Sequence, residues 1–390
     1  MKKKRILVTA STFPRWKGDT EPRFILDLSE ALSEYYDITV LVPFAPGALA
    51  QERMGNVEVI RYHYFPIHKW ETLCYPGAIV PRIKEKKIRI LLVPFLFLAL
   101  YWQLWKRMKD YDLVHAHWVI PQGMVQSLFK KKYIVTGHGS DIMSLNKGIL
   151  RKFKNHVFQR ASKVVVVSDL LREKVKEITP MIQPEILSMG CDTTMFSPKY
   201  RKENYFEQKQ QKVVLFVGRL EEVKGVEYLI DAMEHIDAKL VIAGSGSLEQ
   251  SLKDRAAKYG EKIAFIGTKT HDELRECYAS ADVFAMPSVT TSKGVKEGLG
   301  LVILEAMASG LPVAAFASGG ITQLIKHEEN GLLCEEKDVK ALAENINCLL
   351  WEEELREKLI ENSNKTVTEY DYKEIAKKYS KIYAEVLLEK

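Results

Sequence analysis

The sequence is poor in cysteine and has none of the cysteine spacings that bind metal. Five cysteines are scattered along 390 residues, and no two of them form a Cys-x-x-Cys pair. We therefore expect neither a disulfide framework nor a zinc site, and a reducing compartment fits this usage. The start of the chain, MKKKRILVTAS, has a basic cap followed by an apolar run too short for a secretory signal. These features predict a cytoplasmic protein.

The sequence also lacks an apolar run long enough to predict a transmembrane helix. The apolar stretch Ile90–Trp105 has 16 residues with one strongly polar side chain, Gln103, and it contains Pro94. Spanning a bilayer takes about 20 such residues, and we expect Pro94 to interrupt the run. Two interpretations stay open: a buried crossover helix, or a helix that docks peripherally on an anionic membrane surface. The second is suggested by the flanking basic residues Lys84, Lys86, Lys87, Arg89, Lys106, Arg107 and Lys109.

Acidic residues are scarce in the first half of the chain. Residues 1–190 hold 30 Lys and Arg but 17 Asp and Glu, a balance of +13, whereas the remainder has a balance of −7. This excess is typical of proteins with anionic partners, namely phosphates, acidic lipid head groups or nucleic acid. A solvated, lysine-rich face explains it equally well.

Short apolar, β-branched runs alternate with helical patterns, without an internal repeat. This alternation predicts parallel sheets built from right-handed βαβ units. The polar stretch Met189–Lys212 separates two series of strands, which indicates two doubly wound α/β domains facing each other across a cleft. The predicted strands are Arg5–Thr9, Ile38–Val42, Val57–Arg61, Leu113–Ala116, Tyr133–Thr136, Val164–Val167 and Glu185–Leu187, then Val213–Val217, Lys239–Ala243, Ile263–Ile266, Val283–Met286, Pro312–Phe316 and Leu332–Cys334.

Two cations follow the first strand of the second series. In VVLFVGRLEEVKG, Arg219 and Lys224 come directly after a strand end. Arg can grip a phosphate with two hydrogen bonds, and Lys adds a mobile point charge. Such a pair could hold a pyrophosphate without a metal ion, although Arg and Lys at a strand end are also ordinary surface charges.

Histidines stand at the ends of two predicted strands in the first series. His138 follows YIVTG, and His115 and His117 lie in LVHAHW. A metal site at these histidines lacks a carboxylate with ligand spacing, so His138 is better interpreted as a substrate contact or an acid–base group. The two carboxylates of the stretch DYD, Asp110–Asp112, have the spacing of a metal-binding pair. They precede a predicted strand, however, whereas ligands of such sheets bind beyond the carboxyl ends of the strands. The glycines of AGSGSLE lack the third glycine of a dinucleotide-binding motif.

Two glutamates stand in the apolar stretch KEGLGLVILEAMASGLPV. Gly310 and Pro312 end a short predicted helix that begins at Leu301. Eight helical residues would separate Glu297 from Glu305 by roughly 12 Å, farther than the paired carboxyls of glycosidases. Two carboxylates that accept hydrogen bonds on either side of a helix N-terminus instead suit a nucleotide sugar. Its hydroxyl groups would bind the carboxylates and its diphosphate would bind the helix end.

With the E-x7-E pair of glutamates and several motifs in family order, the chain resembles the retaining family 4 glycosyltransferases. The motifs are FVGRLEEVKG, FIGTKTHDEL, TGHGSDI, LSMGCDTTMFSP and SGGITQL. The resemblance implies the GT-B fold, with two Rossmann-like domains facing across a cleft. It places an acceptor-binding domain at 1–188, a nucleotide-sugar-binding domain at 189–370, and at 371–390 a helix that crosses back onto the N-terminal domain.

The resemblance also implies roles for individual residues. Arg219 and Lys224 would bind the donor diphosphate, Glu297 the donor sugar and Glu305 the ribose, while His138 would lie beside the transferred sugar. The catalytic candidates are therefore His138, Glu297, Arg219 and Lys224. Further donor contacts would come from Gly267, Gly298, Gly300 and Leu301.

The acceptor side departs from the common family pattern. Many relatives have a Gly-Gly loop after the first strand, where this chain reads STFPRWKGDTEPRF. Gly18, Asp19 and His117 are the candidates there. Gln323 stands where relatives often have Glu, and we assign it no role.

The resemblance implies metal-independent transfer of a hexose-type sugar, with retention, from a nucleoside diphosphate sugar to a glycan or lipid-linked acceptor of the cell envelope. No cofactor and no nucleic-acid partner are expected. The alternatives are a sugar-nucleotide epimerase or a phosphorylase of the same fold, and a non-catalytic sugar-binding protein.

Overall fold

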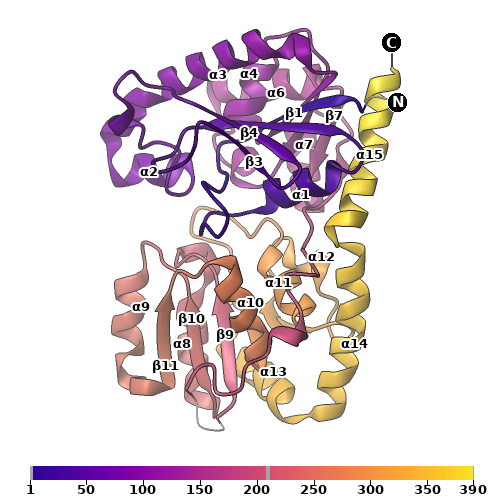
Figure 1. Ribbon diagram of the computed structural model, residues 1–390. Coiled ribbons are helices and arrows are strands. Elements are labelled where there is room, and N and C mark those ends of the chain that lie inside the picture. Colours follow the sequence, from indigo (N-terminus) through magenta and orange to yellow (C-terminus); the bar gives the residue numbers. More distant parts are fainter. Residues whose placement is uncertain (1–2, 208–210, 390) are drawn as a thin grey trace. The chain divides into compact units, whose positions relative to one another are not determined.

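The computed structural model describes residues 3–207 and 211–389. The chain forms two compact units, Met1–Met189 together with Tyr372–Lys390, and Gly190–Asp371. Each unit is a sheet with helices on its faces (Figure 1). Residues 208–210 of the predicted linking segment, and residues 1, 2 and 390 of the predicted domains, lie outside the described residues.

The sheet of the first unit has the strand order β3-β4-β2-β1-β5-β6-β7-β8. Its strands are parallel except for β3, which pairs antiparallel with β4. Most of the apolar strand residues are buried, as in other parallel sheets covered on both faces, whereas Ile186 of the edge strand β8 is exposed. The strands are β1 (Arg5–Thr9), β2 (Asp37–Pro43), β3 (Gln51–Met54), β4 (Val57–Tyr62), β5 (Leu113–His117), β6 (Tyr133–Gly137), β7 (Lys163–Val166) and β8 (Glu185–Ile186).

The sheet of the second unit is parallel throughout its described strands, in the order β11-β10-β9-β12-β13-β14. The direction of winding reverses between β9 and β12, and ligands of such sheets bind beyond the carboxyl ends of the strands at this switch point. The strands are β9 (Val213–Val217), β10 (Lys239–Ala243), β11 (Ile263–Gly267), β12 (Val283–Met286), β13 (Val313–Phe316) and β14 (Leu332–Cys334).

The α/β class predicted from the sequence is confirmed, and each predicted strand overlaps an observed one. The observed strand β3 was not predicted from the sequence. Its sequence, QERM, has no alternation of apolar residues, and it joins β4 through a tight turn at Gly55 and Asn56. The left-handed φ of +58° at Gly55 suits such a turn.

Helices connect the strands of both sheets. In the first unit they are α1 (Phe24–Leu32), α2 (Ile79–Glu85), α3 (Val93–Arg107), α4 (Met124–Gln126), α5 (Ser140–Met143), α6 (Gly148–Arg160), α7 (Asp169–Ile178) and α15 (Tyr372–Leu388). In the second unit they are α8 (Val226–Ala232), α9 (Glu249–Ala256), α10 (His271–Ser280), α11 (Leu301–Ala308), α12 (Ile321–Leu324), α13 (Val339–Trp351) and α14 (Glu353–Glu369).

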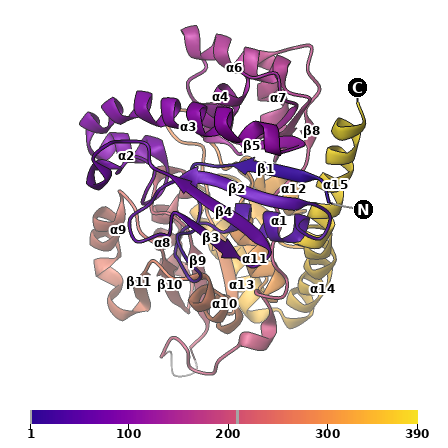
Figure 2. The same ribbon diagram turned by 45° about the horizontal axis from the view of Figure 1, so that its top comes forward.

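Helix α15 lies beside α1 in the first unit (Figures 1 and 2). The hydroxyl group of Tyr36 donates a hydrogen bond to the carbonyl oxygen of Ser380 over 3.0 Å. The side of α15 that is buried carries Tyr372, Ile375, Ala376, Tyr379, Ile382, Tyr383 and Val386. The C-terminal helix is therefore part of the core of this unit.

Helix α3 differs from expectation in one respect. Pro94 lies in its first turn, where proline is tolerated, so it begins the helix instead of interrupting it. Within the described part of the chain, the helical segment Lys87–Asp110 is long and apolar enough to cross a membrane by length and composition alone. An 18-residue window of this segment has a mean hydropathy of 1.7, and 28% of that window is buried inside the protein.

Candidate functional site

The carboxyl ends of β9 and β12 bring a lysine and a glutamate together in the second unit. Lys224 lies in the loop after β9, and Glu297 lies in the loop that leads from β12 to α11. The distance between Lys224 Nζ and Glu297 Oε2 is 2.6 Å, and the two side chains are only 12% and 15% exposed. Ser288 Oγ is 3.5 Å from the same carboxylate oxygen. The pair therefore stands at the switch point, sheltered from water.

The charges around Glu297 keep it ionised. Burial acts to raise the pKa of this carboxyl group, but the charge and hydrogen bond of Lys224, together with smaller contributions from neighbouring groups, lower the pKa below its usual value. The positive charge of Arg219, which is exposed in the same loop as Lys224, adds to the lowering. Three of the four predicted catalytic residues are thus electrostatically coupled.

Two glycines explain why the loop holding Glu297 takes its position. The backbone N–H of Gly320 donates to the carbonyl oxygen of Glu297 over 3.0 Å. A Cβ atom at Gly319 would stand 2.2 Å from that oxygen, and one at Gly320 would stand 2.1 Å from the carbonyl oxygen of Gly298. Only glycine permits this approach, which gives the Gly-Gly turn of SGGITQL a physical function.

Glu305 is held by a residue that the sequence analysis missed. The hydroxyl group of Tyr278, in the last turn of α10, donates to Glu305 Oε2 over 2.9 Å. Burial first and the neighbouring charge of Glu305 second raise the pKa of Tyr278. Tyr278 resembles an ordinary core residue in the sequence because its neighbours along the chain are apolar or small.

The separation estimated from the sequence for the two glutamates does not apply. It treated the whole interval as helix, whereas α11 begins at Leu301 and Glu297 lies in the preceding loop. Gly300, with a left-handed φ of +89°, is the N-cap of α11. Gly298 and Leu301 flank this turn, so the first backbone N–H groups of α11 are close to Glu297 in the chain.

Gly267 is farther from this pair in the sheet. It ends β11, at the edge of the sheet, and its carbonyl oxygen accepts from Gly244 N–H over 2.8 Å. Strand β10 lies between β11 and β9. Among the predicted donor residues, Gly267 is therefore separated from the Lys224–Glu297 pair by a strand.

The predicted histidines cluster at the ends of β5 and β6 in the first unit. His117 Nδ1 lies 2.9 Å from His138 Nε2, and the centroid of the His115 ring lies 4.0 Å from that of the tilted His117 ring. Burial lowers the pKa of His115 and of His138 to about 3, and it lowers the pKa of His117 as well. All three are therefore neutral near pH 7, so each can donate one hydrogen bond and accept one.

Asp141 positions His138 through the backbone. Its carboxylate accepts hydrogen bonds from the N–H groups of His138, Gly139 and Val119 over 3.1, 2.9 and 2.9 Å. It thereby ties the turn after β6 to the turn after β5. Asp141 lies in the motif TGHGSDI, but the sequence does not indicate its role, because hydrogen bonds to backbone N–H groups leave no pattern in a sequence.

The predicted acceptor-side loop follows β1, and Asp19 serves to hold it together. Its carboxylate accepts from Arg15 Nε and the Arg15 backbone N–H over 3.0 and 2.8 Å, and from Thr20 N–H over 2.9 Å. Burial opposes ionisation of Asp19, but the hydrogen bonds of Arg15 lower its pKa. Gly18 makes the turn with a left-handed φ of +85°. Asp19 and His117 are both buried.

Within the described residues, no group of three or more His, Cys, Asp or Glu side chains is arranged to hold a metal ion. Both ring nitrogens of His115 already have partners, Tyr383 and Thr136.

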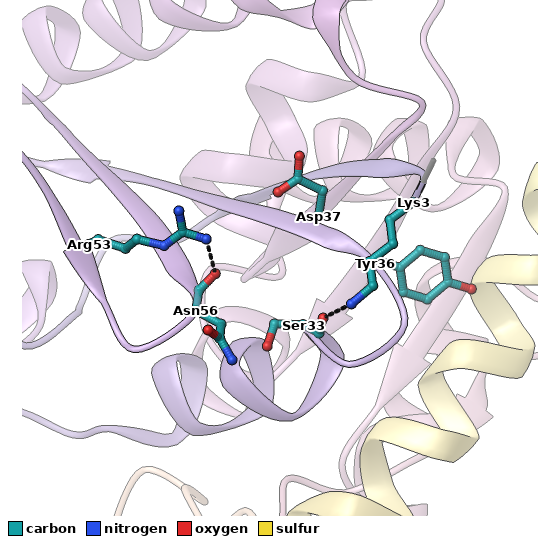
Figure 3. A pocket seen from close by; sticks show the side chains of 6 residues that line it. All are labelled: Lys3, Ser33, Tyr36, Asp37, Arg53 and Asn56. Carbon is teal, nitrogen blue, oxygen red and sulfur yellow. Dashed lines mark hydrogen bonds between the residues drawn. The ribbon is translucent and has the colours of Figure 1, made fainter. Parts of the chain in front are cut away.

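A pocket of the first unit lies elsewhere, at the amino ends of β1 and β2, and contains none of the predicted site residues. Figure 3 shows its lining, which consists of Lys3, Ser33, Tyr36, Asp37, Arg53 and Asn56.

Two family profiles match the chain in succession. The profile described as Glycosyltransferase Family 4 matches residues 22–195, and that described as Glycosyl transferases group 1 matches residues 199–366. An uncharacterized glycosyltransferase of Methanocaldococcus jannaschii is 32% identical over 298 residues, which cover 70% of this chain and 75% of that protein. The chain therefore belongs to the family 4 glycosyltransferases.

A relative with a more specific name is the GDP-mannose-dependent alpha-(1-6)-phosphatidylinositol monomannoside mannosyltransferase of Mycobacterium tuberculosis. It is 30% identical over 232 residues, which cover 56% of this chain and 60% of that protein.

Solved structures confirm the GT-B fold class. Sucrose-phosphate synthase from Thermosynechococcus elongatus has a TM-score of 0.79 at 21% identity, over 98% of this chain and 99% of that one. HepE from Anabaena, solved in complex with UDP-glucose, has a TM-score of 0.71 at 18% identity, over 98% of this chain and 99% of that one. At these identities the likeness concerns the fold alone.

Proposed function

We propose that the protein transfers a hexose-type sugar from a nucleoside diphosphate sugar to a glycan acceptor, with retention at the anomeric carbon. The observation that carries this proposal is the sheltered Lys224–Glu297 pair at the switch point of the second sheet, 2.6 Å across. The Lys224 ammonium group can bind a phosphate there, and the adjacent Glu297 carboxylate can accept hydrogen bonds from sugar hydroxyl groups. A nucleotide sugar requires both contacts.

In this proposal the diphosphate, the sugar and the ribose of the nucleotide sugar each contact particular residues. Arg219 and Lys224 bind the diphosphate, together with the backbone N–H groups at the start of α11. Glu297 accepts hydrogen bonds from the sugar hydroxyls, and Glu305, oriented by Tyr278, accepts from the ribose. Gly298, Gly300 and Leu301 give the phosphates room, and Gly267 contributes from the edge of the sheet. The two cations stabilise the departing diphosphate without a metal ion.

The proposed transfer needs no protein nucleophile. The bond between the anomeric carbon and the diphosphate oxygen breaks, and the acceptor oxygen bonds to the same face of that carbon. The proton of the acceptor hydroxyl passes to the departing diphosphate. Glu297 forms an ion pair with Lys224, and this pairing disfavours nucleophilic attack of the Glu297 carboxylate on the sugar. His138, neutral and held by Asp141, contacts the transferred sugar, with Gly18, Asp19 and His117 on the acceptor side.

We further propose that the acceptor is a lipid-linked or cell-surface glycan, and that the protein acts in the cytoplasm at the membrane. The name of the mycobacterial relative, which combines a nucleotide sugar with a phosphatidylinositol acceptor, supports this choice. UDP-glucose in the HepE structure supports a nucleotide-sugar donor.

A donor screen followed by a transfer assay tests the proposal. Thermal shifts with UDP-glucose, GDP-mannose and ADP-glucose identify the donor, because a ligand well above its dissociation constant raises the melting temperature. The donor that binds is then mixed with polyprenyl-linked and phospholipid-linked sugars. We expect nucleoside diphosphate release that depends on acceptor, and a product with the donor's anomeric configuration by NMR. Donor conversion without acceptor would indicate an epimerase, and binding without turnover a sugar-binding protein.

A further inference from the structure

Helix α3 has apolar side chains on two opposite faces, and only one of them is buried. The buried face packs on its own unit, including β4 and α4. At about 100° per residue, the centres of the two faces lie about 180° apart around the helix. The buried face consists of Leu96, Leu100 and Leu104 with Leu92 just before the helix, and the exposed face, which we call the α3 stripe, consists of Phe95, Leu98, Trp102 and Trp105 with Leu91 just before the helix.

The α3 stripe is a continuous apolar surface. Leu98 is 66% exposed, and Trp102 and Trp105 are 57% and 55% exposed. The two tryptophan rings stack on each other with centroids 5.0 Å apart. A single exposed hydrophobic residue needs no explanation, but a row over four turns marks an interaction surface.

Neighbouring aromatic residues extend the surface beyond α3. Phe95 contacts Phe65 edge-on at 4.8 Å, and Phe65 stacks on Trp70, which is itself exposed. Both views of the ribbon show α3 and α2 at the outer side of the first unit (Figures 1 and 2). The surface is therefore accessible from outside this unit.

The α3 stripe has a basic rim. Exposed lysines stand before it and after it, and the carboxylate of Glu85 between them is paired with Arg82 and Arg89. Two arginines expected beside the stripe from the sequence are not in this rim: Arg89 is buried and belongs to the internal cluster, and Arg107 is half-buried and donates to the side chain of Gln103. The rim consists of Lys84, Lys86, Lys87, Lys106 and Lys109.

Charge selects the partner of this surface. Two copies of the chain meeting through the α3 stripe would bring identical lysine rims together, which is repulsive, whereas anionic lipid head groups neutralise them. Tryptophan side chains favour the level of the head groups. Because Leu92, Leu96, Leu100 and Leu104 are held in the core of the unit, a membrane bound to this face would have the helix along its surface and not across it.

We propose that the α3 stripe and its lysine rim bind the surface of an anionic phospholipid membrane, with α3 parallel to the membrane plane. This deepens the proposed function, on which it rests only for the membrane location of the acceptor. Binding positions the first unit at the surface in which a lipid-linked acceptor is embedded.

Co-sedimentation of the full chain with vesicles tests the proposal. Vesicles of phosphatidylcholine with 30 mol% phosphatidylglycerol are compared with pure phosphatidylcholine vesicles, at low and at high salt. We expect binding that requires the anionic lipid and weakens with salt. Trp102→Ser/Trp105→Ser should lose about tenfold or more in affinity through lost apolar contact, and Lys106→Glu/Lys109→Glu should lose at least about tenfold.

Matched control variants lie in the second unit. Trp351→Ser and Lys340→Glu change an exposed tryptophan and an exposed lysine there and should bind vesicles like the unchanged protein. The proposal is overturned if vesicle binding does not depend on lipid charge or if the α3 variants bind like the unchanged protein. It is also overturned if the protein stays with the vesicles after an alkaline wash, as an integral membrane protein does. A concentration-dependent dimer that the tryptophan variant abolishes would assign the stripe to a second copy. Donor thermal shifts should be the same in all variants, so a failed vesicle test and a failed transferase assignment are distinguishable.

Discussion

The hydroxyl group of Tyr383 lies 2.6 Å from Nδ1 of His115, a residue 268 positions earlier in the chain. The other ring nitrogen of His115 lies 2.8 Å from Thr136 Oγ1, so a fully buried histidine has a partner on each side. Helix α15 thus contributes a polar contact to β5, the strand that carries His117 and lies next to the strand that precedes His138. The C-terminal helix supports the histidine cluster as well as the core.

Tyr383→Phe should therefore destabilise the protein without removing apolar contact. A buried nitrogen left without its partner costs about 1–3 kcal/mol, and we expect the free energy of unfolding from a urea titration to fall by that amount. Tyr35→Phe, the same change at an exposed tyrosine, should alter it by less than about 0.5 kcal/mol. Equal stabilities of the two variants would contradict a structural role for the Tyr383–His115 hydrogen bond.

The buried histidines should make the protein sensitive to mild acid. Burial lowers the pKa of His115 to about 3 in the folded state, whereas an unfolded histidine titrates near pH 6.5. The unfolded state therefore binds protons first as the pH falls, and stability is lost progressively from about pH 6.5 down to the folded pKa. Between pH 6.5 and 4.5 the loss should reach about 1.4 kcal/mol per pH unit for each such histidine, before most carboxylates protonate.

The acid effect is measured by repeating the urea titration at pH 6.5, 5.5 and 4.5. His115→Gln should have a shallower dependence on pH than the unchanged protein, because one titrating group has been removed, even though its stability at pH 7 is lower. A free energy of unfolding that is constant across this range would show that the histidines are not kept neutral.

How far the sequence predicts this protein depends on the range of the interaction. Strands such as β1 and β9 are predictable because their β-branched, apolar runs are local, whereas β3 is not, since QERM owes its structure to pairing with β4. The sequence indicates that α3 is apolar but not which of its faces is covered, because both faces carry large side chains. Lys224 after a strand end and Glu297 before a helix start were visible in the sequence, and the family resemblance placed both at the nucleotide sugar.

Other parts of the candidate site were beyond the reach of the sequence. Tyr278 acts by donating to the carboxylate of Glu305, and Asp141 acts by accepting from backbone N–H groups. Neither contact produces a characteristic residue spacing in the sequence. The Gly-Gly turn at Gly319 and Gly320 was visible as a motif, but its cause, the approach of the Glu297 loop, exists only in three dimensions.

Lys224→Ala and Glu297→Ala should each reduce sugar transfer by about 100-fold or more, because each removes a charged contact that is proposed to act on the donor. Circular dichroism should remain that of a folded protein in both variants. Lys253→Ala breaks an exposed ion pair with Glu249 in the same unit and serves as the matched control, with transfer near normal. Turnover close to that of the unchanged protein in either site variant would remove that residue from the proposed mechanism.

Tyr278→Phe should weaken donor binding more than it slows turnover. Its hydroxyl group orients Glu305, which we assign to the ribose, and the ribose is not the reacting part of the donor. Loss of this hydrogen bond to a charged group should raise the KM for the donor about 10-fold or more, with kcat changed much less. Glu305→Gln should show the same division between KM and kcat, whereas Tyr228→Phe, the same change in α8, should show neither effect. A fall in kcat at unchanged KM would instead place Glu305 at the reacting centre.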